Sequence, residues 1–171
     1  MTPRVLETGG EFPAKEQIYG LGELTFLYMR APIYQAASVA QLRSVLQPAI
    51  DTGNFAVMRQ DHVPRGAITF ALVDAETEQK LISGALLTSE EWTSGDRVWL
   101  LDLVAPYGHG STARLMRFWH DSLPKDVTHY QAQRYGKSRD AVRRFTGRRL
   151  PNGRWGARVW KDPYTLPDEY R

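Results

Sequence analysis

The sequence contains no cysteine, which excludes disulfide bridges, thiolate metal sites and a cysteine nucleophile. This composition fits a reducing compartment, so we expect a cytoplasmic protein. Long apolar runs are also absent, since the longest, Ile68 to Val73, is interrupted by Thr69, whereas a membrane-spanning helix needs roughly 20 apolar residues. The N-terminal stretch carries acidic residues and glycines where a signal peptide requires an unbroken apolar segment. We therefore expect neither a signal peptide nor a transmembrane segment.

Internal repeats and low-complexity tracts are absent too, and the middle of the sequence forms one block. Hydrophobic residues make up 42% and charged residues 24% of the 171 residues, a balance typical of a chain that folds by itself. Such a length can bury a sizeable core in one domain. We expect a single domain over residues 19–161, with an N-terminal segment at 1–18 and a C-terminal tail at 162–171.

Motifs that hold a metal or a nucleotide are lacking. No histidine lies at a metal-ligand spacing such as HExxH, and the Gly-x-Gly at Gly108 to Gly110 lacks the lysine of a P-loop. Ser111 lacks the G-x-S-x-G context of a nucleophilic serine. We expect no metal site and no resident cofactor. The four histidines are His62, His109, His120 and His129.

Apolar periodicity predicts that the fold opens with two helices. Leucines and other apolar residues recur at helical spacing in 21–28 and in 39–50, the second stretch behind Ser38 as an N-cap. Residues 54–60 and 66–74 are rich in Val, Ile, Phe and Thr and are typical of antiparallel strands, joined by a hairpin through the five residues between them.

The second half predicts a sheet with one central helix. Residues 98–104 give the strongest strand signal, near-continuously apolar as a central strand would be. A helix with one apolar face follows, with Ser111 as its expected N-cap. Strands near 127–135 and 157–160 are weaker predictions, and residues 75–89 are ambiguous. The order of elements predicts an α+β domain with a mixed sheet flanked by helices.

Asp102 interrupts the predicted central strand. An ionised carboxylate among apolar residues is costly unless it is paired or hydrogen-bonded, so this side chain needs a partner. Asp102 is then either an acid that orients a base or a substrate amine, or an outward-facing or structural residue. The residue alone leaves both readings open.

Gly108, Gly110 and Ser111 lie between this strand and the next helix. Glycines let backbone amides approach a ligand closely, and a helix N-terminus favours an anion such as a pantetheine phosphate or a developing oxyanion. The arrangement resembles, in degenerate form, the pyrophosphate loop of the GCN5-related acetyltransferase fold. The alternative is a simple chain reversal with a helix cap.

Basic residues are concentrated in the last third of the chain, although the net charge is only +3. This asymmetry predicts an anionic partner: nucleic acid, phospholipid headgroups, a phosphopantetheine group or an acidic protein. A solvated basic face is the alternative. Against the single acid Asp140, the segment contains Arg134, Lys137, Arg139, Arg143, Arg144, Arg148, Arg149, Arg154, Arg158 and Lys161.

The run from Trp92 through Asp102 to Gly108 carries a family pattern. It contains W-T-S-G-D-R at 92–97, then Trp99, Asp102 and A-P-Y-G at 105–108. With these residues the sequence closely resembles the RTX-toxin-activating lysine acyltransferases, the haemolysin-activator family. The resemblance covers about residues 21–150, which is most of the chain.

The resemblance implies a GCN5-related N-acetyltransferase-like fold. It also implies an enzyme that transfers a fatty acyl group from acyl carrier protein to internal lysines of an RTX-type protoxin, in the cytoplasm before the toxin is exported. Asp102 falls on the catalytic aspartate of the family, and Arg134 falls near its conserved arginine. Acyl carrier protein is acidic, which makes it a candidate ligand for the basic segment. We expect the donor at Arg134, Gly108, Gly110 and Ser111; a homodimer remains open.

Members of the family carry S-P-x-H after the first helix, with the histidine as the catalytic residue. The corresponding residues of this sequence, 31–34, read A-P-I-Y, so Tyr34 replaces the histidine and Ala31 the serine. Val45 replaces a family asparagine. Tyrosine, with a pKa near 10, is a poor base but can protonate a leaving thiolate. Asp102, a water molecule or a histidine such as His62 would then deprotonate the acceptor lysine.

Two other functions compete with acyl transfer. A catalytically degenerate relative would bind acyl carrier protein or a toxin without chemistry, as the changes at Ala31, Tyr34 and Val45 suggest. Nucleic-acid binding through the arginines, with Trp155 and Trp160 as stacking residues, ranks last because no nucleic-acid motif accompanies the charge. We therefore predict a lysine acyltransferase and no nucleic-acid partner.

Overall fold

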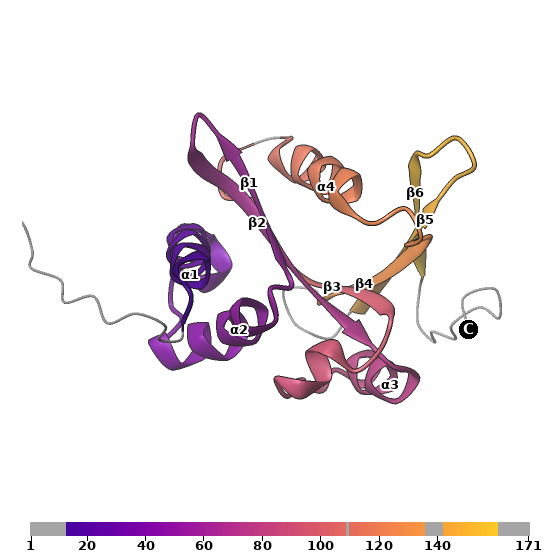
Figure 1. Ribbon diagram of the computed structural model, residues 1–171, viewed down its shortest axis with the longest axis horizontal. Coiled ribbons are helices and arrows are strands. Elements are labelled where there is room, and N and C mark those ends of the chain that lie inside the picture. The colour runs from indigo at the N-terminus through magenta and orange to yellow at the C-terminus, as the bar shows by residue number, and fades with distance from the viewer. Residues whose placement is uncertain (1–12, 109, 136–141, 161–171) are drawn as a thin grey trace, which may run out of the picture.

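The computed structural model describes residues 13–108, 110–135 and 142–160, which form a six-stranded sheet covered by helices on both faces (Figure 1). The α-helices and strands are, in chain order, α1 (Lys15–Tyr28), α2 (Val39–Thr52), β1 (Phe55–Gln60), β2 (Val63–Val73), α3 (Ala75–Ser83), β3 (Arg97–Val104), α4 (Ser111–Ser122), β4 (His129–Tyr135), β5 (Val142–Arg149) and β6 (Trp155–Trp160). Two short 3-10 helices, η1 (Pro32–Tyr34) and η2 (Glu90–Thr93), lie between them.

The strands follow one another across the sheet in chain order, β1 to β6. All neighbours are antiparallel except β3 and β4, which are parallel and are joined through α4. The β3–β4 register is limited to Trp99 with Gln131 and Leu100 with Ala132, so the two strands do not pair at their carboxyl ends. The predicted α+β class, a mixed sheet flanked by helices, is confirmed.

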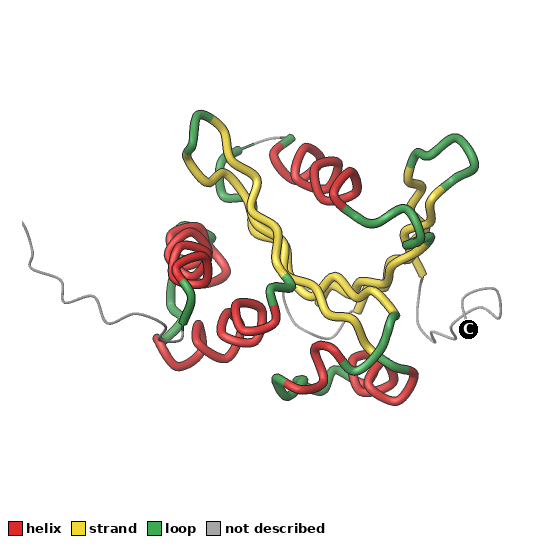
Figure 2. The backbone as a smooth tube through the Cα atoms, in the orientation of Figure 1, coloured by secondary structure: helices red, strands yellow, loops and turns green. Residues whose placement is uncertain are grey.

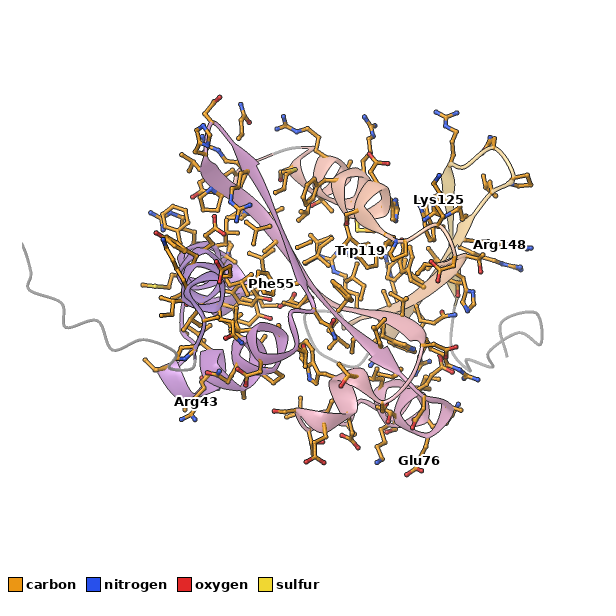
Figure 3. The ribbon with its side chains drawn as sticks, viewed as in Figure 1. Arg43, Phe55, Glu76, Trp119, Lys125 and Arg148 are labelled. Carbon is orange, nitrogen blue, oxygen red and sulfur yellow. The ribbon has the colours of Figure 1, made fainter. Side chains whose placement is uncertain are left out.

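Helices α1 and α2 lie on one face of the sheet and α4 on the other (Figure 2), and side chains fill the space between each group and the sheet (Figure 3). Phe55 lies between β1 and the pair α1 and α2, and Trp119 lies between α4 and the sheet. The α1 and α2 side buries Leu24, Leu27, Tyr28, Leu46, Ile50, Val57, Ala67 and Val104, whereas the α4 side buries Ile68, Val98, Leu115, Trp119, Leu123 and Tyr130.

The helix that begins at Val39 and the β1–β2 hairpin form where the sequence predicts them. Ser38 caps α2 in a capping box, because its hydroxyl accepts from the amide of Gln41 at 3.2 Å while the Gln41 side chain accepts from the Ser38 amide at 2.8 Å. The hairpin is tighter than the predicted five-residue loop. Asp61 and His62 alone form the turn, both with positive φ (51° and 63°), as in the type I′ turns that match strand twist.

Three features differ from the sequence prediction. Helix α1 begins at Lys15, inside the segment assigned to residues 1–18, and α3 occupies part of the ambiguous stretch 75–89. Strand β5 was not predicted, because its arginine-rich sequence hides the alternation of buried and exposed residues. The predicted tail at 162–171 lies outside the described residues.

Most of the 92–99 motif has a structural role around a buried carboxylate. Glu78 of α3 is 2% exposed; its Oε1 accepts a hydrogen bond from Trp99 Nε1 at 2.9 Å and its Oε2 pairs with the Arg97 guanidinium. Gly95 has no room for a side chain, because an added Cβ would lie 2.5 Å from the backbone nitrogen of Asp74. The motif thereby fixes α3 and the start of β3.

An aromatic cluster ties the end of α4 to β4 and β6. His120 Nε2 lies 3.1 Å from Tyr130 Oη, and the imidazole stacks on Trp155 with ring centroids 4.9 Å apart. Burial is the main reason that the pKa of His120 is lowered to about 4; the charge of Asp121 partly offsets the effect of burial, and that of Arg149 adds to it. The imidazole is therefore neutral in the folded protein at neutral pH.

We expect this histidine to make the fold sensitive to acid. Since its folded pKa lies below the unfolded value of about 6.5, the unfolded chain binds the proton more tightly, and stability falls as the pH drops from about 6.5 to about 4. Urea denaturation at pH 7 and pH 4.5 would measure the loss. His120→Gln should lose less stability than the wild type over this interval, and equal losses would rule out His120 as a cause.

Candidate active site

A bulge in β3 determines which way Asp102 faces. Thr69 of β2 is opposite Asp102 while Phe70 is opposite Leu100, so Leu101 is an extra residue in β3. Strict alternation from Leu100, which packs on the α4 side, would direct Asp102 to that side. A bulge sets two residues against one, and Asp102 consequently faces α1 and η1.

Tyr34 is the partner that the carboxylate of Asp102 requires. Its hydroxyl donates to Asp102 Oδ2, and Asp102 Oδ1 accepts from the amide of Leu103 at 2.7 Å. The Tyr34 ring is half-buried against the α1 and α2 core. Burial raises the pKa of Tyr34 above its usual range, and the nearby charge of Asp102 raises it further. Tyr34 therefore holds its proton, aimed at the carboxylate, over the physiological pH range.

A second tyrosine lies beside this pair. The Tyr28 ring centroid is 4.7 Å from that of Tyr34, and burial together with the charge of Asp102 raises the pKa of Tyr28. Its buried hydroxyl and that of Thr69 make no hydrogen bond of good geometry within the described residues. Tyr28 was not among the predicted site residues. The only signal was its place at the end of α1, six residues before Tyr34, where helical periodicity assigns it to the core.

The loop before α4 contains two glycines in the left-handed conformation, and its helix cap differs from the prediction. Gly108 and Gly110 have positive φ (86° and 79°), and Gly110 is the N-cap of α4. The prediction that Ser111 is the N-cap is wrong by one residue, because Gly110 takes the left-handed conformation and Ser111 starts the helix. The Ser111 hydroxyl instead contacts two carbonyls of the loop, Ala105 O at 3.2 Å and Gly108 O at 2.7 Å.

The structure does not bring the other predicted residues to Asp102. Arg134 is exposed on β4, on the face opposite to Gln133, which contacts α3. His62 is at the tip of the hairpin, seven residues before Thr69, which pairs with Asp102. Seven residues of extended strand place His62 about 20 Å from Thr69. Of the two candidate bases, Asp102 and not His62 therefore lies next to Tyr34. Val45 packs against the same core cluster as Tyr34.

No three His, Asp or Glu side chains of the described chain are grouped so that they could hold a metal ion. Among the helices of the same residues, none is both long and apolar enough to cross a membrane.

Residues 14–146 match the family described as "HlyC: RTX toxin acyltransferase family". The chain belongs to this family. In this RTX toxin acyltransferase family member, the hydrogen-bonded pair of Tyr34 and Asp102 lies within the matched residues.

Individual relatives agree with the family match. The chain is 39% identical to the leukotoxin-activating lysine-acyltransferase LktC of a Pasteurella haemolytica-like species over 52% of this chain and 54% of that protein. It is 29% identical to the protein-lysine palmitoyltransferase CyaC of Bordetella bronchiseptica over 86% of this chain and 77% of that one. The matched part thus spans about half (54%) of the length of this LktC and of the serotype A11 LktC of Mannheimia haemolytica.

Among solved structures, the chain is similar to GphF, a GNAT-like decarboxylase in complex with isobutyryl-CoA. The identity is 22%, the TM-score is 0.46, and the match covers 70% of this chain and 64% of that one.

Proposed function

We propose that this protein transfers a fatty acyl group from a thioester donor to the side-chain amine of a lysine in another protein. The observation that carries the proposal is the hydrogen bond from Tyr34 to Asp102, which joins a proton donor to the carboxylate that the resemblance assigns as the catalytic aspartate. The family match and the relatives, which are named as lysine acyltransferases or a protein-lysine palmitoyltransferase, support the reaction class.

The partners follow from the same family. We propose acyl-acyl carrier protein as donor, an RTX-type protoxin as acceptor, and the cytoplasm as the compartment. Exposed arginines of β5 and the β5–β6 turn, among them Arg143, Arg148 and Arg154, would favour an acidic carrier protein. Arg134 is placed opposite Arg143 in the β4–β5 register, so two like charges face the same partner.

The proposed reaction moves one proton from lysine to sulfur. The neutral amine attacks the thioester carbonyl, the carbon–nitrogen bond forms, and Asp102 takes a proton from the attacking nitrogen. As the carbon–sulfur bond breaks, Tyr34 gives its proton to the leaving thiolate. The proton on Asp102 then passes to the tyrosine oxygen along the hydrogen bond that already joins them. The raised pKa of Tyr34 disfavours a free tyrosinate, so the two transfers to and from Tyr34 must be nearly concerted.

Tyr34→Phe is expected to slow acyl transfer about tenfold to a hundredfold. General acid catalysis is typically worth a factor of about 10² or more, but a thiolate, whose conjugate acid has a pKa near 8.5, leaves more easily than an amine. The measurement is single-turnover acylation of a candidate acceptor with acyl-acyl carrier protein, followed by intact-mass spectrometry. Tyr19→Phe, an exposed tyrosine on α1, is the matched control.

The same assay tests the function itself. A lysine-linked acyl mass formed by the wild-type protein supports the proposal. No added mass, with carrier-protein binding retained, would identify a binding protein descended from an acyltransferase. An unchanged rate in Tyr34→Phe would leave acyl transfer in place but remove Tyr34 from the proton relay.

A further inference from the structure

Two buried hydroxyl groups lie next to the candidate active site. Thr69 of β2 is opposite Asp102 in the strand register and is 0% exposed, and Tyr28, the last residue of α1, is 1% exposed. Neither hydroxyl has a hydrogen-bond partner of good geometry among the described residues. A buried hydroxyl without a partner costs free energy, whereas phenylalanine and valine would fill the same space without that cost. Packing alone therefore does not explain these two residues.

Both hydroxyls face the carboxylate of Asp102. Along β2, Ala67 packs with α1 and α2 and Ile68 with α4, so Thr69 faces α1 as Asp102 does. Burial is the main cause of the raised pKa of Tyr28. Asp102 raises it further, as an acceptor of the tyrosine proton does, and Thr69 lowers it, as a donor to the tyrosine oxygen does. These contacts run in one direction, from Thr69 through Tyr28 to Asp102.

The carboxylate of Asp102 is already held by two other donors. Its Oδ2 accepts from the hydroxyl of Tyr34, and its Oδ1 accepts from the amide of Leu103 at 2.7 Å. The proposed transfer removes the first of these donors, because Tyr34 gives its proton to the leaving sulfur. A carboxyl group that has lost this donor is free to turn away from the tyrosine oxygen to which it must return a proton. A further hydroxyl beside it would prevent that rotation.

We propose that Tyr28 is a positioning residue for Asp102, an inference that rests on the proposed function. The Tyr28 hydroxyl donates to the carboxyl group while the Tyr34 proton is on the sulfur, and Thr69 donates to the Tyr28 oxygen in turn. Tyr28 keeps its own proton throughout, so it adds no step to the reaction and leaves the proton balance unchanged.

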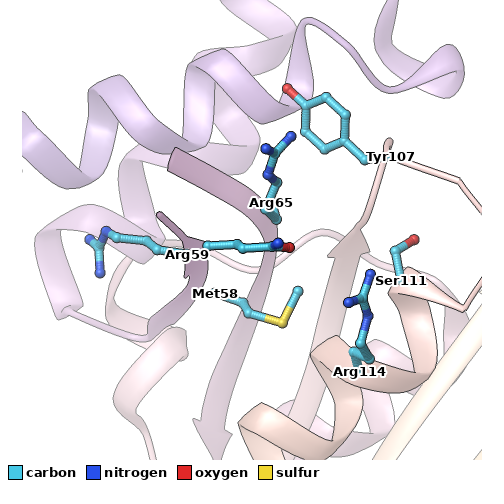
Figure 4. A pocket seen from close by; sticks show the side chains of 7 residues that line it. Met58, Arg59, Arg65, Tyr107, Ser111 and Arg114 are labelled. Carbon is cyan, nitrogen blue, oxygen red and sulfur yellow. The ribbon is translucent and has the colours of Figure 1, made fainter. Parts of the chain in front are cut away.

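Tyr28 acts through Asp102 and not on a substrate. Its side chain is closed off from solvent. The surface pocket in Figure 4 lies between the β1–β2 hairpin and the first turns of α4, and neither Tyr28 nor Thr69 lines it. Removal of either hydroxyl should therefore change the rate of the chemical step and leave the affinity for the acyl donor as it is.

The test is the single-turnover acylation described above, with donor affinity measured separately. Tyr28→Phe keeps the ring and should slow acylation about tenfold at unchanged affinity, the lower end of the range for hydrogen bonds to charged groups. In the Asp102→Asn background the same change should have no further effect, because no base is left to position. Thr69→Val, which leaves α1 intact, should slow the reaction less.

Tyr130→Phe is the matched control. It removes a buried tyrosine hydroxyl on the α4 side of the sheet, where Tyr130 Oη lies 3.1 Å from His120 Nε2, and it should acylate at the wild-type rate. Wild-type rates in both Tyr28→Phe and Thr69→Val would overturn the inference. An equal loss from Tyr28→Phe with and without the Asp102 carboxylate would also overturn it, since Tyr28 would then act by packing alone.

A carboxyl signal separates this inference from the proposed function. In ¹³C NMR spectra of the full chain, the side-chain carboxyl resonance of Asp102 is the one that disappears in Asp102→Asn. In the Tyr34→Phe background, Tyr28→Phe should shift this resonance and Tyr130→Phe should not. The measurement needs no catalysis. A shift in a protein that does not acylate would refute the proposed function and keep the contact of Tyr28 with Asp102, and the absence of a shift would overturn the inference whether or not the protein acylates.

Discussion

Asp102→Asn is expected to lower the rate of lysine acylation about 10²- to 10⁴-fold, the range of a lost general base. The amide has nearly the shape of the carboxylate and can still accept the hydrogen bond from Tyr34, but it cannot take a proton from the lysine amine. The loss should therefore appear in the rate of the chemical step and not in the affinity for the donor. Single-turnover acylation, with donor affinity measured separately, gives both quantities.

Asp96→Asn is the matched control, since Asp96 belongs to the same motif and is exposed. It should acylate at the wild-type rate. If Asp102→Asn kept more than about a tenth of wild-type activity, Asp102 would be a positioning residue and a water molecule would have to act as the base. Thermal melts of both variants establish that the difference is not one of folding.

Glu78→Ala is expected to destabilise the fold by about 3–5 kcal/mol, the cost of removing one partner of a buried ion pair. The carboxylate, 2% exposed, is the common acceptor for Arg97 and Trp99. Its loss leaves the Trp99 indole without its partner and the Arg97 charge unpaired. Urea denaturation followed by tryptophan fluorescence would show the change as a lower midpoint.

Glu76→Ala provides the comparison on the same helix. The Glu76 side chain is 83% exposed and contacts only Lys80 as an ion pair, at 3.5 Å, so its removal should change stability by less than about 0.5 kcal/mol. A loss below about 1 kcal/mol for Glu78→Ala would mean that water replaces the carboxylate at Arg97 and Trp99.

The residues of the motif that begins at Trp92 divide between folding and chemistry. Gly95, Arg97 and Trp99 pack β3 against α3, with Glu78 as the shared partner. Asp102 of the same motif instead accepts a hydrogen bond from Tyr34. Three residues of the motif therefore position the strand, and a fourth supplies the carboxylate of the candidate site.

Local sequence patterns were sufficient for the α+β class, for α2 and for the central strand. The capping residues of α2 lie three positions apart, and β3 is apolar from Val98 to Val104 except at Asp102, so each signal is contained within a few residues. Asp102 was identified for the same reason, because a lone acid in such a run requires a partner. Strand β5 and helix α3 were missed because charged residues cover their outer faces and their buried residues contact distant elements.

Only the tertiary structure decided where the site residues meet. The bulge at Leu101 puts Asp102 on the face of Tyr34, and the register with β2 puts Thr69 opposite it. Register between strands depends on hydrogen bonds and packing across the whole sheet, and a shift of one residue moves a side chain to the other face. The sequence by itself therefore determined the α+β class and identified Asp102 as a candidate site residue. The pairing of strands distant in sequence determined that Asp102 contacts Tyr34.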